Sequence, residues 1–304
     1  MSTNFKKAGA KVALFTAALI WGSSFLIVKN SMDNIQPNLL IAIRFTISCL
    51  LLSVIFCKRL KKINKDYVIK GGIIGFFLFL AYMLQTIGIT DTTPGKNAFL
   101  TSIYCVIVPF LFWAVNKKKP DAFNIIAAVI SMIGIAFVSL NEGFSIGMGD
   151  SLTMISGFGY AAHLVAIAKF GREKDPILLT IIQFGFAAVM SWIAAILFHE
   201  TQTVWNFEII TSVLYLAVFA TAIAMLLQNI GQKYTKPAPA AILLSLESVF
   251  GVLFSVVFYH EKITIRLFIG FLLIFLAVII SETKLSFLFK NRKEIPGQGE
   301  TLKA

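Results

Sequence analysis

Glu247 is the one acidic residue that falls in the middle of a long apolar run. It lies about nine residues into the run 238–259, roughly 14 Å deep if the run is helical. An ionised carboxylate at that depth is unfavourable, so it usually faces a cavity or a partner. Glu247 is therefore a candidate for contact with an amine or for proton coupling. The alternative is a protonated carboxyl, or one paired with Ser245 or Ser248, that holds two helices together.

His163 and three aromatic residues are further candidates to line a cavity. His163 is the only histidine inside an apolar run, at a depth close to that of Glu247. It either couples to that carboxyl or forms a structural hydrogen bond. Trp21 lies near the middle of the first run, although tryptophan favours membrane interfaces. We expect Trp21 to line a cavity with Tyr82 and Tyr104; packing between helices is the alternative.

The sequence offers little support for catalysis or for metal binding. His199-Glu200 and His260-Glu261 form two His-Glu pairs, but nothing completes a set of three or four metal ligands. Neither a Walker motif nor HExxH is present. The three cysteines include no CxxC pair. We therefore expect a protein that is not an enzyme and that holds no metal and no other cofactor.

The elements that carry these residues are predicted to be membrane helices. Hydrophobic residues make up 58% of the 304 residues and charged residues 14%, with a mean hydropathy of +0.83. The apolar residues form runs of roughly 20, long enough to cross a bilayer, where only helices and closed barrels satisfy the backbone. We predict an all-α polytopic membrane protein whose ten spans cover residues 12–28, 39–56, 67–89, 97–115, 123–140, 151–168, 177–198, 209–229, 238–259 and 265–280.

A segment of the sequence occurs twice, 143 positions apart. Residues 84–106 match residues 227–249 at ten positions, and the matches include Gln, Gly, Thr, Pro and Ser as well as aliphatic residues. Five spans in each half is an odd number, so the second half enters the membrane inverted. We predict two five-helix inverted repeats, residues 12–140 and 151–281, followed by a polar cytoplasmic tail at 282–304.

The repeat also predicts two gates on opposite faces of the membrane. Pro94 follows two threonines in the outer turn, and Pro237 follows Thr and Lys in its inner copy. Gln85 and Gln228 are equivalent through the repeat and lie near opposite ends of their spans. We predict that these four residues form or latch the gates. For the two glutamines, an amide at a helix end that contacts lipid headgroups is the alternative.

The positions of Lys and Arg predict the orientation. With the N-terminus inside, 22 of the 27 basic residues fall in inner segments, and the outer loops 141–150 and 199–208 have none. Both termini are therefore predicted to be cytoplasmic, and the net charge of +12 reflects topology instead of nucleic-acid binding. Arg44 lies about five residues into the second span from outside, where a long side chain reaches the interface, so we do not assign it as a ligand.

Several motifs resemble the EamA branch of the drug/metabolite transporter superfamily. They are Trp21-Gly22-Ser23-Ser24-Phe25 followed by Lys29, Arg44 in the second span, Val108-Pro109-Phe110 in the fourth, and Ser245-Leu246-Glu247-Ser248-Val249-Phe250 with Glu261 after the ninth. The resemblance covers residues 12 to 281 in two halves.

The resemblance implies a ten-helix inverted-repeat carrier with a central cavity lined by helices one, three, four, six, eight and nine. The candidate substrate-binding residues are those that lie on these helices: Trp21, Tyr82, Tyr104, His163 and Glu247. Members of the family commonly carry a proline after the glutamate of helix nine, where this chain has Ser248. A straighter ninth helix is therefore expected.

The function expected from the residues and the resemblance is secondary transport. We expect an exporter of small organic solutes, such as amino acids or related metabolites, that works by alternating access and exchanges its solute for protons at Glu247. A proton-independent facilitator is the alternative within this class. A membrane-embedded lipid-handling protein or a non-transport membrane protein is the alternative outside it. The expected location is the bacterial cytoplasmic membrane, as a monomer or homodimer whose partners are the small-molecule substrate and the bilayer.

Overall fold

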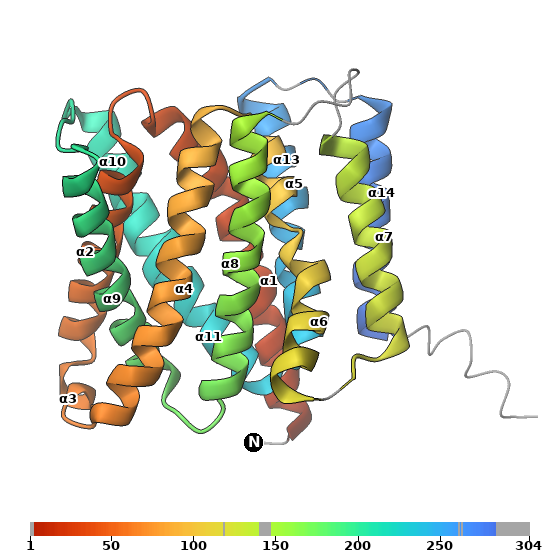
Figure 1. Cartoon of the computed structure of the whole chain (residues 1–304), viewed down its shortest axis with the longest axis horizontal. Coiled ribbons are helices and arrows are strands. Elements are labelled where there is room, and N and C mark those ends of the chain that lie inside the picture. The colour runs from red at the N-terminus through yellow and green to blue at the C-terminus, as the bar shows by residue number, and fades with distance from the viewer. Residues whose placement is uncertain (1–2, 118, 140–146, 261, 263, 284–304) are drawn as a thin grey trace, which may run out of the picture.

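The computed structural model of the chain describes residues 3–117, 119–139, 147–260, 262 and 264–283. Within these ranges every regular element is a helix, and the β pairing is limited to one bridge between Ile35 and Thr203. The helices stand side by side, with the N-terminus at the lower end of the molecule in Figure 1. The all-α prediction is confirmed. Glu261, most of the loop 141–150 and residues 284–304 of the predicted tail lie outside the described residues.

Within the described residues, eight helical segments are long and apolar enough to cross a membrane. They are α1 (Thr3–Ser31), α2 (Pro37–Ile55), α4 (Lys65–Thr90), α5 (Pro94–Thr101) with α6 (Tyr104–Asn116), α8 (Met148–Phe170), α9 (Pro176–Leu197), α10 (Phe207–Tyr215) with η1 (Leu216–Ile223) and α11 (Ala224–Tyr234), and α12 (Pro237–Leu244) with α13 (Leu246–Phe258). The other two predicted spans correspond to α7 (Ala122–Ser139) and α14 (Ile265–Thr283), whose apolar stretches are shorter. A short helix, α3 (Cys57–Leu60), follows α2.

Helices α5 and α12 begin in the same way, as the sequence repeat predicts. Each has a proline as its first residue, where the missing N–H has no helical partner to lose. Thr93 caps α5, because its hydroxyl oxygen accepts a hydrogen bond from the backbone N–H of Lys96 at 3.2 Å. Lys236 precedes α12 and makes no side-chain cap.

Both copies of the repeated segment are interrupted at the same place. Ser102 and Ile103 separate α5 from α6, and Ser245 separates α12 from α13. At the two breaks the backbone N–H groups of Cys105 and Ser248 each donate to the carbonyl three residues back, at 3.0 Å, which tightens the turn. The ninth predicted span is therefore not one continuous helix, and its straightness relative to a proline-containing helix stays a prediction. The hydroxyl of Ser248 donates to the carbonyl of Ser245 at 2.6 Å, and such serine-to-backbone bonds bend helices without proline.

The two halves of the chain pack into each other. Helix α1 packs against α11 and α13, and α4 packs against α8 and α9 (Figure 1). A Cβ placed on Gly88 of α4 would meet Thr153 of α8, and one on Gly231 of α11 would meet Ala10 of α1. Gly88 and Gly231, like Ala10 and Thr153, are 143 positions apart, so this is one contact made twice. The structure therefore contains two copies of one unit, each completed by the other.

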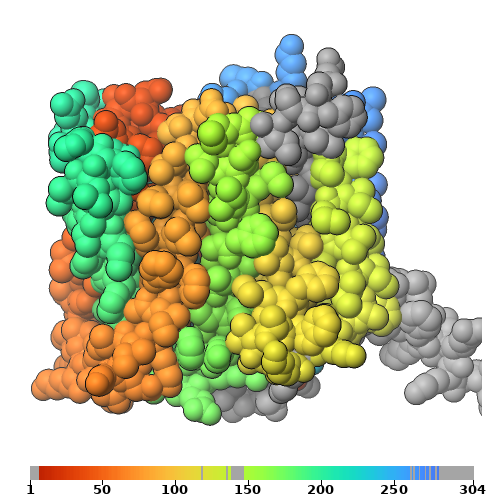
Figure 2. Space-filling view, in the orientation of Figure 1, coloured from red at the N-terminus to blue at the C-terminus, as the bar shows by residue number. Residues whose placement is uncertain are grey.

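The outer faces of the helices are apolar. Figure 2 shows the face on which α4 and α8 lie side by side. Exposed side chains on these two helices and on α9 include Phe76, Phe158 and Val189. A surface of this kind suits contact with hydrocarbon. Together with the eight long apolar helices, it makes the chain a multi-pass membrane protein.

Gly71 and Gly75 allow α4 and α9 to approach closely, as their GxxxG spacing predicts. A Cβ on Gly71 would lie 2.5 Å from a methyl carbon of Ile182. A Cβ on Gly75 would lie 2.7 Å from the backbone oxygen of Gln183, which cannot move aside cheaply. The two glycines therefore serve the packing of α4 against α9.

The close approach at Gly75 predicts a loss of stability on substitution. We expect Gly75→Ala to lower the free energy of unfolding by about 1–3 kcal/mol, because the added methyl group overpacks the interface. The control is Gly185→Ala in α9, where the added carbon meets only the Cys49 sulfur at 3.7 Å and helix propensity gains up to about 1 kcal/mol. Thermal unfolding in detergent, followed by tryptophan fluorescence, measures both. Equal melting temperatures would contradict the packing argument.

Candidate functional site

One cavity draws its lining from both halves of the chain. Its volume is about 40 Å³, room for a few water molecules. The five side chains predicted to line a cavity all do so: Trp21, Tyr82, Tyr104, His163 and Glu247. They come from α1, α4, α6, α8 and α13. The structure therefore brings together residues that are up to 226 positions apart, from Trp21 to Glu247.

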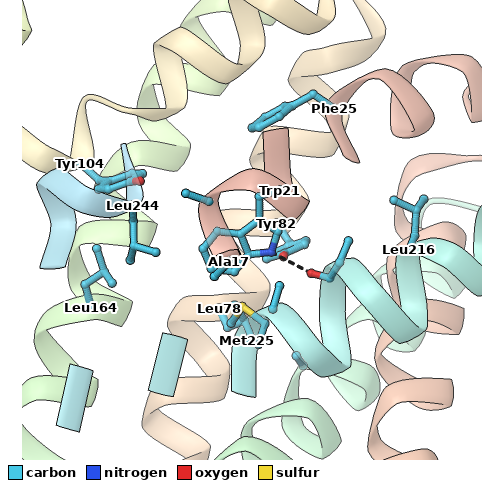
Figure 3. Close-up of a cluster of buried hydrophobic side chains, with 14 of the residues drawn as sticks. Ala17, Trp21, Phe25, Leu78, Tyr82, Tyr104, Leu164, Leu216, Met225 and Leu244 are labelled. Atoms are coloured by element: carbon cyan, nitrogen blue, oxygen red, sulfur yellow. Dashed lines mark hydrogen bonds between the residues drawn. The ribbon is translucent and has the colours of Figure 1, made fainter. Parts of the chain in front are cut away.

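Trp21 ties the two halves together at this cavity. Its indole N–H donates a hydrogen bond to the carbonyl of Ala220 at 2.7 Å, the dashed line in Figure 3. Ala220 belongs to η1, so the bond joins the first span to the eighth predicted span. Figure 3 also shows Tyr104 near Leu244 and Leu164, which line the same cavity. Trp21 thus both packs between helices and lines the cavity.

Three tyrosines form a connected aromatic wall. The ring of Tyr160 lies 5.7 Å from that of Tyr82 and 6.2 Å from that of Tyr104, measured between centroids. Sequence reasoning missed Tyr160. It precedes His163 by three residues on α8, a spacing that puts both on one helix face, and this signal was available in the sequence.

Arg44 also lines the cavity, which corrects the expectation that it reaches the interface. The residue is 2% exposed. Its guanidinium carbon lies 5.2 Å from the centre of the Tyr82 ring, and both Nε and one terminal nitrogen donate to the hydroxyl of Thr221, at 3.3 and 3.2 Å. The side chain points inward because the ring and the hydroxyl supply the partners that the headgroup region would otherwise offer.

Tyr104 and Glu247 occupy equivalent positions in the repeat. They are 143 positions apart, and each lies in the first turn after the break in its span. Glu247 is 5% exposed, and no Lys, Arg or His of the described residues forms an ion pair with it. The Tyr104 hydroxyl lies close to the Glu247 carboxyl, but it meets hydrogen-bond geometry with no side chain in the described part of the chain. The break in each span therefore delivers one polar group to the cavity.

Of the two roles considered for His163, the structure shows the structural hydrogen bond. Its Nε2 lies 3.0 Å from Oε1 of Gln183 in α9, so the ring is held by a buried hydrogen bond. With the proton on Nε2, the ring donates to the amide oxygen. The same residue still lines the cavity. No ion pair joins it to Glu247.

Gln85 and Gln228 both line the cavity instead of facing lipid headgroups. The Gln85 amide oxygen accepts a hydrogen bond from the Tyr160 hydroxyl at 2.6 Å, and its nitrogen donates to Thr101 at 2.9 Å. Gln228 donates to the side-chain oxygen of Gln232 at 3.0 Å. The two amides therefore belong to the polar lining.

The turn that carries Pro94 lies at one end of the molecule and is held by a polar network. Lys96 pairs with Asp150 of α8 at 2.6 Å, with side chains 17% and 5% exposed, and Thr92 donates to the same carboxylate at 2.6 Å. Lys29, in the last turn of α1, donates to the backbone oxygens of residues 89 and 90 at 3.0 and 2.9 Å. Helices α1, α4, α5 and α8 are thereby joined at this end.

The turn that carries Pro237 lies at the other end of α1 and borders a large cavity. Pro237 lines a cavity of about 750 Å³ together with Lys7 and Lys11 from the start of α1. The wall also includes Lys119, Arg172 and Lys236. The two equivalent turns thus lie at opposite ends of the molecule, as the inverted repeat predicts. Pro239, in the second copy, stands at the position that Lys96 holds in the first.

Cation-binding groups do not gather at this site. Among the described residues, no cluster of three or more His, Cys, Asp or Glu side chains is arranged to hold a metal ion. The polar lining of the cavity consists of tyrosines, amides, His163, the hydroxyls of Ser24 and Thr86, and the side chains of Arg44 and Glu247. Such a lining suits non-covalent binding of an organic molecule.

The buried pair at the Pro94 end predicts a selective loss of stability. We expect Asp150→Asn to lower the free energy of unfolding by about 1–3 kcal/mol, since it removes the carboxylate that two side chains bond. Asp66→Asn is the matched control, because Asp66 also lies in the first turn of its helix but is 46% exposed where it pairs with Lys70 and Lys174. Exposed pairs contribute about 0–1 kcal/mol. Thermal unfolding in detergent measures both variants. Equal melting temperatures for the two variants would contradict the argument.

Comparison with known proteins gives a consistent result. The model of the EamA-like transporter family matches residues 9–140 and again residues 147–283. An uncharacterized transporter of Archaeoglobus fulgidus is 36% identical over 276 residues, covering 90% of this chain and 86% of that protein. The uncharacterized transporter YvbV of Bacillus subtilis is 26% identical over 288 residues, covering 90% and 92%.

Two further similarities are more distant. A transporter of S-adenosylmethionine and S-adenosylhomocysteine from Chlamydia trachomatis is 23% identical over 212 residues, covering 64% of this chain and 62% of that protein. A solved crystal structure superposes with a TM-score of 0.71 at 19% identity, covering 94% of this chain and 99% of that one, and so shares its fold. The two family matches and the 36% identity place the chain in the EamA-like transporter family of the drug/metabolite transporters.

Proposed function

We propose that this protein is a secondary transporter that exports amino acids or related metabolites by alternating access. The observation that carries the proposal is the central cavity, which is lined by both repeats. It contains the buried carboxyl of Glu247, which pairs with no basic side chain of the described residues. The proposed substrate-binding residues are Trp21, Tyr82, Tyr104, His163 and Glu247. A cavity of about 40 Å³ is too small for such a solute, so binding requires the helices around it to separate.

The relative from Chlamydia trachomatis supports this substrate class. Its name gives it two substrates, and both carry an amino-acid head group. Aromatic rings beside polar groups, as in the wall of Tyr82, Tyr104 and Tyr160, suit the apolar part of such molecules.

The proposed gates are the two equivalent turns with Pro94 and Pro237, together with Gln85 and Gln228. In support, the Pro94 end is joined by the pair of Lys96 and Asp150, whereas the Pro237 end contains the cavity of about 750 Å³. This asymmetry fits a carrier that is open at one end and shut at the other. Exchange of ends would then require the ion pair to break.

The proposed topology has ten spans, with both termini in the cytoplasm. It consists of two five-helix repeats, residues 12–140 and 151–281, and a polar tail at 282–304. The support is the distribution of basic residues, 22 of 27 on the proposed inner side, and the presence of α7 and α14 at the positions of the fifth and tenth spans.

Native Cys57 provides a direct test of this orientation. It is exposed, whereas Cys49 is partly buried and Cys105 is buried. We expect a membrane-impermeant maleimide to label Cys57 only after the cells are permeabilised, because the α2–α4 connection is cytoplasmic. The control places a cysteine at exposed Gln202 in a Cys57→Ser background, and it should react in intact cells. Labelling of Cys57 in intact cells would show that the orientation is the opposite of the one proposed.

Proton coupling is proposed to operate through Glu247. The carboxyl holds either a proton or the ammonium group of the solute, so that loading of one displaces the other. A proton-independent facilitator remains the alternative, in which Glu247 contributes only to binding or packing. The two differ in their response to an imposed pH gradient.

The test is uptake into liposomes by the purified protein, with all proteinogenic amino acids screened in pools and an inside-acid gradient imposed or omitted. We expect gradient-dependent uptake in the wild type and, for Glu247→Gln, uptake equal to that of protein-free liposomes. Glu208→Gln is the matched control, since Glu208 also lies in the first turn of a helix but is exposed. An uptake rate that changes neither with the pH gradient nor with the Glu247 substitution would favour the facilitator.

A further inference from the structure

Two ionisable side chains of opposite type are buried at one cavity, and neither has an ionic partner among the described residues. Arg44 and Glu247 both line the cavity and are 2% and 5% exposed. Within the described residues, no salt bridge forms between them or from either one to another side chain. A buried charge is unfavourable unless it is paired. When it is ionised, each side chain can therefore pair with a group of opposite charge that enters the cavity.

The surroundings of Arg44 orient its guanidinium without neutralising it. The ring of Tyr82 lies against it, and the Thr221 hydroxyl accepts from two of its nitrogens. Thr221 in turn donates to the carbonyl of Leu216, five residues back, at 2.7 Å, as expected in the π-helical segment η1. Guanidinium has five N–H donors, so several remain for a carboxylate, which it binds with two parallel hydrogen bonds.

The surroundings of Glu247 leave its carboxyl open to the same space. It begins α13 just after the break at Ser245, and the hydroxyl beside it belongs to Tyr104. Tyr82 and Tyr160 lie within electrostatic range of both Arg44 and Glu247. The tyrosines thus lie near both charges, in the part of the cavity where a bound molecule would bridge them.

We infer that the cavity recognises a zwitterionic head group, with Arg44 binding the carboxylate and Glu247 the ammonium group of an α-amino acid. This inference rests on the proposed transport function and assigns a substrate-binding role to Arg44. A solute that lacks one of the two charges leaves the other buried side chain unpaired, so singly charged analogues are rejected. A site built for a polar group excludes the analogue that lacks it far more strongly than a site that fills space.

Three forms of one side chain test the inference in the wild-type protein. The probes are L-phenylalanine, its methyl ester, which keeps only the cation, and N-acetyl-L-phenylalanine, which keeps only the anion. The same three forms of L-leucine cover an aliphatic side chain. We expect the zwitterion to be transported, or to raise the melting temperature, at concentrations at least about 100-fold lower than either singly charged form. Equal potency of a parent amino acid and either derivative would overturn the inference.

Two substitutions test which side chain binds which charged group of the solute. Arg44→Gln should abolish the preference for the amino acid over its ester while N-acetylated forms stay excluded. In the melting-temperature assay, which needs no transport, Glu247→Gln should abolish the preference over the N-acetylated form while esters stay excluded. Arg266→Gln and Glu208→Gln, at exposed positions, are the controls and should keep the wild-type ranking. If both cavity variants weakened all probes by one factor, the residues would be structural and the inference would fail.

Other outcomes separate this inference from the proposed function. Transport of an amine or an organic anion, but of no amino acid, would keep the carrier and overturn the zwitterion site. Stabilisation by amino acids without transport of any probe would support the site and overturn the carrier. If the Arg44 variant fails to fold, Thr221→Val is the substitute. It removes the hydroxyl that orients the guanidinium, so it should reduce the preference for the amino acid over its methyl ester.

Discussion

The structure depends on one constraint, the satisfaction of backbone hydrogen bonds where no water is available. Helices meet this constraint within each span, which is why the described chain is helical almost throughout. Two spans nevertheless break, at Ser102–Ile103 and at Ser245, and the tightened three-residue bonds with serine hydroxyls recover much of what is lost. Non-helical backbone at this depth is tolerated where protein buries it. The breaks therefore lie against the central cavity, and the first turn after each break places Tyr104 or Glu247 in the cavity lining.

The internal repeat supplies a scaffold on which equivalent positions have diverged. Gln85 and Gln228 keep the same amide, and both line the cavity. Tyr104 and Glu247 share a backbone position but bring a neutral hydroxyl and a carboxyl to it. At the turns, Lys96 pairs with Asp150, while its counterpart Pro239 cannot form an ion pair. The two turns have equivalent positions in the repeat but different side chains. This difference explains why an ion pair joins the helices at one end of the molecule while the other end contains a large cavity.

Buried charge separates the structural from the functional parts of this protein. The pair of Lys96 and Asp150 is compensated where it lies, and its role is to join helices. Arg44 and Glu247 are as deeply buried, but within the described part of the chain neither forms an ion pair. Retaining two such groups opposes stability, since apolar residues of similar volume would pack there at lower free energy. In the proposed complex with a zwitterionic solute, both side chains would gain a partner of opposite charge.

The sequence by itself determined the helical class, the repeat, the helix starts at Pro94 and Pro237, and five residues of the cavity. The class, the repeat and its turns are local or periodic, so composition, run length and self-comparison reveal them. The five cavity residues came from their depth in the apolar runs and from the family resemblance. Only the tertiary structure decided that Arg44 turns inward to Tyr82 and Thr221, that Tyr160 joins the aromatic wall, and that His163 bonds Gln183. The physical reason is that a membrane helix is apolar on its lipid face and largely apolar on its buried face, so its sequence only weakly records which side meets which neighbour.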